Sequence, residues 1–298
     1  MSKEIVKNYG KSIRDRLLNI AKSENIYYQT VLTRYFQERL IYSFQERLIY
    51  RMSQTSYRQN FYLKGGALMY AHDRFAARPT LDIDFLGNNI SNKGERIVAA
   101  FREICSVPCK EDGVKYDVEH ITSKNITELK DYHGVRLGIP VSMDTVAQVL
   151  TMDIGFGDVV TPAPVNLDYP ALLEHLPTAS ILAYSLETVV AEKMHAVIDL
   201  ADQSSRMKDY YDLYQILNNQ ELDTEVLQEA IVRTFENRHT QYDPDTMFFR
   251  NDFGANPVME TRWKAFMKKI TVRQSILFSD IVAYLQERLL PYWNKLNH

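Results

Sequence analysis

The stretch Leu81–Phe85 constrains the fold of this chain more than any other. Apolar and acidic residues alternate along it (Leu-Asp-Ile-Asp-Phe), which is the period of a β-strand with one buried face. Asp82 and Asp84 would project together from the other face, about 7 Å apart. Two such carboxylates repel each other unless a cation lies between them. Alone, the pattern also fits the solvated face of an edge strand, so the rest of the chain decides its meaning.

A second stretch, Ala147–Phe156, shows the same alternation and carries Asp153 on its polar face. This period again indicates a strand. A third carboxylate on a strand next to Asp82 and Asp84 would complete an oxygen-rich site of the kind that binds divalent cations.

A glycine pair precedes the acidic strand. The short apolar run Phe61–Leu63 ends at Lys64-Gly65-Gly66, and Ala67–Ala71 then has the pattern of a helix start. A strand, two glycines and a helix in this order let the backbone approach a phosphate and direct free helix N–H groups at it. A Gly-Gly pair alone is usually just a turn. A glycine turn, a short helix and then two alternating aspartates is a much rarer order.

The remaining patterns indicate a mixed centre with helices at both ends. Residues 1–58 look helical throughout, and no Gly- or Ser-rich linker divides the chain. We expect helices at 93–106, 186–200, 206–217, 222–239 and 258–290, further strands at 115–122 and 134–141, and a packed aromatic loop at 242–253. The expected fold class is α+β, with an N-terminal helical segment (1–58), an α/β domain with a mixed sheet (59–168) and a helical C-terminal domain (169–298).

An octapeptide nearly repeats in the N-terminal segment. Tyr35–Tyr42 is followed by Ser43–Tyr50, which differs only in its first residue. Eight residues is not a helical period, so the two copies would be rotated by about 80° relative to each other on one helix. We interpret the repeat as a local duplication without a catalytic role.

Charged residues in the helical half have two interpretations each. Lys193 falls within the apolar stripe of its helix, and since lysine is rarely buried unpaired, it either extends to the surface or reaches into a site. Glu192 fits a surface acid or an ion-pair partner. Lys208, Asp209 and Asp212 are expected on the polar face of the next helix, where an ordinary i,i+4 Lys–Asp pair would also explain them.

Composition narrows the class of protein. The chain has no apolar run near the ~18 residues of a membrane span, and its N-terminus lacks the pattern of a secretory signal. We therefore expect a cytoplasmic protein, with Cys105 and Cys109 reduced within a helix, because no other Cys or His pair has zinc spacing. The net charge of −3 is uneven. Residues 1–60 and 262–298 are basic and 61–261 acidic, which fits arms for a polyanion around a metal site, or ordinary solvated helices.

Taken together, these stretches resemble the AbiEii/AbiGii family of nucleotidyltransferases. The resemblance rests on Leu63–Gly66, Arg78–Phe85, Met152–Asp158, Tyr169-Pro170, Val189–Lys193 and Ser205–Asp212, in the same order and spacing, within about residues 28–270. It implies a DNA polymerase β-like fold, in which helices flank the mixed sheet. It also implies a toxin of a type IV toxin–antitoxin or abortive-infection system.

The resemblance implies roles for individual residues. Asp82, Asp84 and Asp153 would bind Mg²⁺ or Mn²⁺, and Asp153 would also help to activate an acceptor hydroxyl. Gly65 and Gly66 would hold the triphosphate of a nucleoside triphosphate (NTP). The other expected nucleotide-binding residues are Lys64, Arg78, Thr80, Lys193, Arg206 and Lys208. Asp209 belongs to the family's last essential motif, so the expected catalytic residues are Asp82, Asp84, Asp153, Lys193 and Asp209.

The implied reaction is metal-dependent transfer of a nucleoside monophosphate from the NTP to a hydroxyl of RNA, such as a tRNA 3′ end. Negative charge must be neutralised on both the attacking and the leaving oxygen, which two metal ions about 3.5–4 Å apart can do. The resemblance also implies a cognate antitoxin as a candidate partner. We expect no membrane partner, since no apolar run is long enough to span one.

One residue departs from the family pattern, and two other hypotheses remain open. Ala67 stands where the family often has Thr or Ser. The backbone amide remains there, so we expect weaker nucleotide binding and not an inactive site. The acceptor could instead be a Ser, Thr or Tyr hydroxyl of a protein. The chain could also be a non-catalytic nucleotide-binding module, although three aspartates and Lys193 argue against that.

Overall fold

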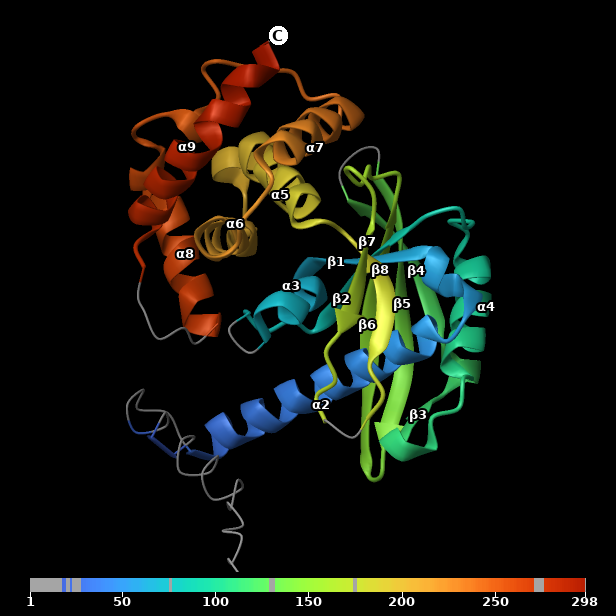
Figure 1. Ribbon diagram of the computed structural model, residues 1–298. Helices are drawn as coiled ribbons and strands as arrows, with labels where there is room; N and C mark the ends of the chain where they lie inside the picture. The colour runs from blue at the N-terminus through green and yellow to red at the C-terminus, as the bar shows by residue number, and fades with distance from the viewer. Residues whose placement is uncertain are drawn as a thin grey trace, which may run out of the picture.

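The structure is a computed structural model that describes residues 18, 19, 22, 28–74, 77–128, 132–173, 176–270 and 276–297. A mixed β-sheet with its covering helices forms one half, and helices form the other (Figure 1). This confirms the expected α+β class.

The sheet places the two aspartate-bearing stretches side by side. Its strand order is β3-β5-β6-β2-β1-β8-β7, and β4 pairs with β5 outside this path. β2 runs parallel to β6 and β1 runs parallel to β8, whereas the other pairs are antiparallel. The strands are β1 (Phe61–Lys64), β2 (Asp82–Gly87), β3 (Val114–Tyr116), β4 (Thr122–Glu128), β5 (Tyr132–Met143), β6 (Val146–Phe156), β7 (Val165–Tyr169) and β8 (Ala179–Ala183).

One face of the sheet is apolar and packs against helices α2 (Tyr28–Ser53) and α4 (Gly94–Cys105). The ring of Phe61 lies 5.1 Å from that of Phe101 in α4, and 6.1 Å from that of Phe85 in β2. Alternate residues of β5 and β6 complete the buried layer: Val135, Leu137, Ile139, Leu150, Met152 and Ile154. The residues between them therefore project from the opposite face.

The C-terminal half is helical and has an aromatic core. Trp263 and Trp293 are both buried in it. The segment 242–253 packs through Phe248 and Phe253, which confirms the expected aromatic loop. The helices are α5 (Leu186–Leu200), α6 (Met207–Asn219), α7 (Thr224–Asn237), α8 (Pro257–Ile270) and α9 (Phe278–Asn294). Among the described residues, we find no helix that combines the length and apolar character needed to cross a membrane.

The expected strand at 115–122 was wrong, because the backbone leaves the sheet in its middle. β3 ends at Tyr116, a 3₁₀ turn spans Val118–His120 and β4 begins at Thr122. At this break the Asp117 N–H still donates to the Pro140 carbonyl of β5, whereas Arg102 of α4 donates to the Val118 carbonyl.

Two further boundaries differ from those expected from the sequence. α4 ends at Cys105, so Cys109 lies outside it. Pro108 intervenes, and a helix rarely continues through the residue before a proline. The sheet also extends past residue 168, since β8 runs to Ala183 and pairs with β1.

α2 carries both octapeptide copies on one continuous helix. The second copy is largely buried, and the Arg51 that follows it donates to the Asp112 carboxylate at 2.6 Å. This buried ion pair fixes the end of α2 to the turn before β3. The side chains of residues 29–40, and residues 1–17 of the expected helical segment, lie outside the described part of the chain.

Candidate functional site

A row of charged residues crosses the polar face of the sheet. Register pairs Arg136 of β5 with Asp153 of β6, and Asp153 with Asp84 of β2. Asp84 in turn pairs with Lys64 of β1. Since neighbouring strands lie about 4.8 Å apart, the row spans roughly 15 Å. Asp82 lies on the same face, two residues before Asp84. The structure thus brings together the three aspartates that the sequence singled out.

The carboxylates of Asp82 and Asp84 are only partly exposed, yet no hydrogen bond or ion pair holds either of them within the described residues. Burial raises the pKa of Asp82, and the charge of Asp153 raises it further. Burial also raises the pKa of Asp84, although Lys208 and Lys64 partly oppose this effect. Two half-buried acids without a partner are typical of a site that binds a cation.

Asp153 differs because a cation of the protein already holds it. Arg136 donates from Nε and from its terminal nitrogen to the two Asp153 oxygens, at 2.7 and 2.6 Å. Such a bidentate pair is strong and directional. Nowhere in the described residues do three or more His, Cys, Asp or Glu side chains form a group that could hold a metal ion.

The donor set still suits one kind of metal ion. Mg²⁺ prefers hard oxygen ligands and is usually held by one or two carboxylates together with water and substrate phosphates. Asp82 and Asp84 offer two such carboxylates on one face of β2, and no ion pair with a described residue holds either of them. These residues therefore fit Mg²⁺ or Mn²⁺, with Asp153 as a third ligand if Arg136 releases it.

The glycine pair is explained by close approach to this site. Gly65 has a φ of +67°, and a Cβ on it would overlap the Asp84 carboxylate. A Cβ on Gly66 would come within 2.6 Å of the Thr80 Cβ. Helix α3 (Gly65–Asp73) begins here without a side-chain cap, so its first N–H groups lie beside Asp84 and have no intrahelical partner.

Lys64 connects the sheet to the helical half. Its amino group donates to Asp158 at 2.7 Å and to Glu192 of α5 at 3.2 Å. Arg238, after α7, donates to Asp158 at 3.2 Å. Burial raises the pKa of Glu192, whereas Lys64 and Arg238 hold the pKa of Asp158 below its usual range despite burial. Glu192 is therefore an ion-pair partner and not a surface acid.

Lys193 lies at the centre of a second ionic cluster. Its amino group donates to Asp209 at 2.9 Å and to Asp212 at 2.8 Å. Arg78 also binds Asp212, at 2.8 Å, and Arg206 binds Asp209, at 2.7 Å. Burial alone would raise the pKa of Asp209, but Lys193 and Arg206 hold it well below the usual range. Three cations thus surround two carboxylates.

This cluster corrects the expected orientation of α6. Asp209 and Asp212 are 1% and 2% exposed, so they do not lie on a solvated face. Lys208 is exposed, and its charge partly opposes the rise in the pKa values of Asp82 and Asp84. Thr80 donates its hydroxyl to the Asp82 carbonyl at 3.2 Å. The expected residues therefore lie in two ionic groups beside the aspartates.

Three residues of these networks were missed by the sequence reasoning: Arg136, Arg238 and the side chain of Asp158. Arg136 alternates with the buried residues of β5, so its place on the polar face was readable. Its pairing with Asp153 depends on strand register, which no local pattern shows. Asp158 stands in one of the stretches that carry the family resemblance, but its partners come from β1 and from the chain after α7.

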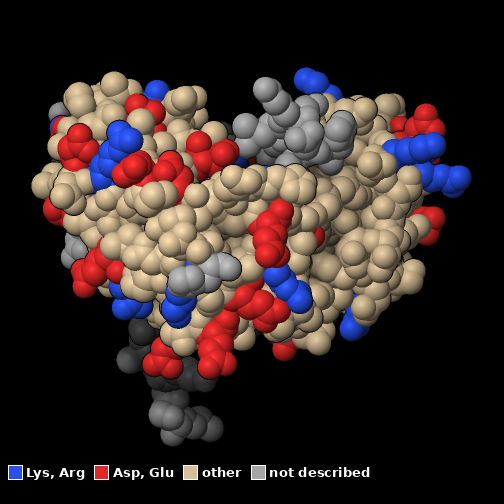
Figure 2. Space-filling model, turned by 90° about the horizontal axis from the view of Figure 1, so that it is seen from above, with Lys and Arg blue, Asp and Glu red and all other residues tan. Residues whose placement is uncertain are grey.

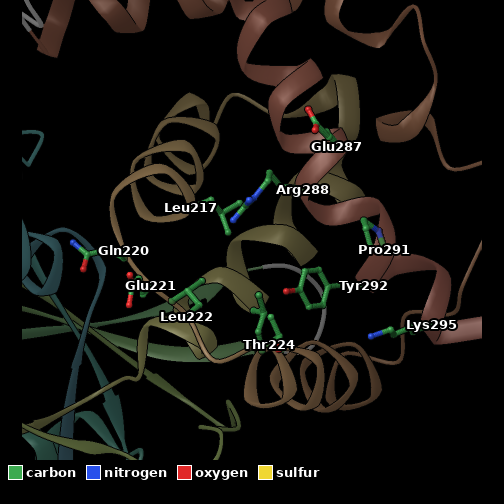
Figure 3. Close-up of a pocket in the computed structure, with 11 residues that line it drawn as sticks. Leu217, Gln220, Glu221, Leu222, Thr224, Glu287, Arg288, Pro291, Tyr292 and Lys295 are labelled. Carbon is green, nitrogen blue, oxygen red and sulfur yellow. The ribbon is translucent and has the colours of Figure 1, made fainter.

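A cavity of about 770 Å³ lies in the helical half, between α9 and the start of α7 (Figure 3). None of the expected site residues lines it. Arg288 and Tyr292 extend from α9 toward the α6–α7 connection in Figure 3, and Glu221 and Glu287 add charges of the opposite sign. We assign no ligand to this cavity.

A central sheet with paired aspartates beside a glycine turn is the arrangement that the family resemblance implies for a nucleotidyltransferase. The family model described as "Nucleotidyl transferase AbiEii toxin, Type IV TA system" matches residues 47–285. The chain therefore belongs to the AbiEii family of nucleotidyltransferase toxins of type IV toxin–antitoxin systems.

One solved structure supports the fold, and a second is reported beside it. JHP933 from Helicobacter pylori is 13% identical, with a TM-score of 0.50, over 88% of this chain and 93% of that chain. A candidate nucleotidyltransferase from H. pylori is 15% identical, with a TM-score of 0.48, over 88% and 96% of the two chains. Curated proteins gave no significant match.

The glycine turn gives a test of packing. We expect Gly66→Ala to lower the free energy of unfolding by about 1–3 kcal/mol, because the new methyl group would overlap Thr80. Gly155→Ala is the control, since its Cβ would meet only Asp158, at 4.0 Å. Urea unfolding measures both. Equal stability of the two variants would contradict the close approach.

His195 gives a test of pH dependence. Burial, with a smaller effect of Arg238, lowers its pKa from 6.5 to about 4. The unfolded chain therefore takes up this proton at higher pH than the folded chain, so the stabilisation is complete above pH 6.5 and is lost as the pH falls toward 4. We expect His195→Gln to lose less stability than wild type between pH 7 and 5 in urea unfolding. Parallel losses would show that His195 does not titrate this way.

Proposed function

We propose that this protein transfers a nucleoside monophosphate from an NTP to a hydroxyl of RNA, with Mg²⁺ held by Asp82 and Asp84, and that this activity is its toxicity. The observation that carries the proposal is the pair of half-buried, unpartnered carboxylates beside the uncapped start of α3. Family membership supports the reaction class. The metal and the acceptor are our inference.

In this proposal the backbone of the glycine turn binds the triphosphate. The N–H groups at Gly65 and Gly66 begin α3, and the start of a helix favours bound anions. Bound Mg²⁺ would supply the charge neutralisation that the phosphates need beside Asp82 and Asp84. Gly65 leaves room for both partners, because any side chain there would displace Asp84.

The acceptor oxygen then forms a bond to the α-phosphorus, and the bond from the α-phosphorus to the bridging oxygen breaks to release pyrophosphate. We infer that Asp153 accepts the proton of the acceptor hydroxyl, since Asp153 lies beside Asp84 on the next strand. Arg206 of the second cluster and the neighbouring Lys208 are both exposed, and we infer that they face the leaving phosphates. Arg206 would be held in position by the buried members of its cluster, which are Lys193, Asp209, Asp212 and Arg78.

The distribution of charge along the sequence supports an RNA acceptor. The terminal regions 1–60 and 262–298 are basic, which favours a polyanion. Figure 2 shows one face of the molecule, on which charges of both signs are interspersed, so charge alone does not mark a track there. As a member of a toxin–antitoxin family, the protein should also have a cognate antitoxin.

Thermal unfolding tests the metal and the nucleotide together. We expect Mg²⁺ and NTP to raise the melting temperature more jointly than either does alone, since the ligands stabilise each other. Asp84→Asn should abolish that joint increase and lower transfer of α-labelled NTP by about a hundredfold or more. The variant should melt higher than wild type without ligands, because a half-buried, unpartnered charge is removed.

Asp168→Asn is the matched control. It makes the same chemical change as Asp84→Asn, but at an exposed position on β7 of the same sheet. It should behave as wild type. Undiminished label transfer by Asp84→Asn would refute the assignment. Label that enters protein instead of RNA would refute the acceptor but not the catalytic site.

A further inference from the structure

A polar groove lies next to the aspartates on the same face of the sheet. It has a volume of about 250 Å³ and runs over β4, β5 and β6, where its polar lining residues are Thr122, Ser123, Lys124, Arg136 and Thr151. Two of them are cations and three carry hydroxyls. Among the described residues that line it, none is a carboxylate.

Strand register explains how these side chains converge. Lys124 pairs with Arg136, and Thr122 pairs with Gly138, which in turn pairs with Thr151. A Cβ on Gly138 would lie 2.8 Å from the Thr122 hydroxyl and 3.4 Å from a methyl group of Val149. The missing side chain therefore keeps the floor of the groove open.

The groove and the aspartates share one residue. Arg136 lines the groove and at the same time holds both oxygens of Asp153. Its side chain is 47% exposed, so a ligand in the groove can reach it, whereas Asp153 is 15% exposed. Lys124 is exposed and makes no ion pair with any described residue. It lies two strands from Asp153, or roughly 10 Å.

This chemistry fits a nucleic-acid backbone. A guanidinium binds phosphate with the same bidentate geometry that it uses for a carboxylate. A phosphate can therefore replace Asp153 as the partner of Arg136. A positively charged groove beside a reactive centre is also how proteins hold single strands. Hydroxyls such as those of Thr122 and Thr151 commonly add hydrogen bonds to phosphate oxygens.

We propose that this groove binds the phosphodiester backbone of the acceptor strand, and that a phosphate bound there draws Arg136 away from Asp153. The inference rests on the proposed function and adds to it the place where the acceptor binds. Release of Asp153 lets its carboxylate join Asp82 and Asp84. The metal site would then be complete only when an acceptor is present, so metal and acceptor must each raise the affinity for the other.

The first experiment measures binding of a fluorescently labelled single-stranded RNA by anisotropy over a range of salt concentrations. Lys124→Gln should weaken binding and reduce the slope of log affinity against log salt by about 0.7, the value for one lost phosphate contact on a single strand. Lys110→Gln is the control, because Lys110 is also exposed but lies beside the Asp112 that α2 binds. Equal slopes for both variants, or no RNA binding by wild type, would overturn the proposal.

The second experiment measures Mn²⁺ binding by electron paramagnetic resonance, without NTP. RNA should raise the Mn²⁺ affinity of wild type about fivefold or more. Arg136→Gln should bind Mn²⁺ more tightly than wild type without RNA, and RNA should change this affinity little. A variant that binds Mn²⁺ no better than wild type would overturn the coupling. The joint stabilisation of the wild type by Mg²⁺ and NTP requires neither bound RNA nor release of Asp153 by Arg136. It therefore separates this failure from failure of the proposed function.

Discussion

Electrostatic repulsion among Asp82, Asp84 and Asp153 is the constraint on which the rest of the site depends. Two parallel strands hold these carboxylates on one face, where burial and the nearby charge of Asp153 both raise the pKa values of Asp82 and Asp84. The protein offsets this cost at the ends of the row, with Arg136 on one side and Lys64 on the other. The compensation is incomplete at Asp82 and Asp84, and that residual negative charge is what a metal ion can use.

Ion pairs also join the sheet to the helices. Lys64 reaches Glu192 of α5, and Arg78, which precedes β2, binds Asp212 of α6. Isolated buried charges are costly, whereas charges with several partners can fix a geometry. These contacts hold the helical half against the end of strand β1, where α3 begins. The exposed Lys208 is held near Asp82 and Asp84 as a consequence.

The positions of the three aspartates could be predicted from the sequence, but the residues that form ion pairs around them could not. Strand periodicity placed Asp82, Asp84 and Asp153 on polar faces, and the family resemblance joined them in one site. Asp209 was misplaced, since a 3.6-residue pattern gives no sign that a charged face is covered by another helix. The ion pair of Asp153 with Arg136 was invisible, because it depends on the register between two strands.

Crystallography with Mn²⁺ and an NTP analogue that resists cleavage between the α- and β-phosphates tests the central claim most directly. Anomalous scattering locates the manganese. We predict a peak at about 2.1 Å from carboxylate oxygens of both Asp82 and Asp84, with the phosphates completing its coordination. Nucleotide bound without metal at these two residues, or manganese bound at another site only, would contradict the account.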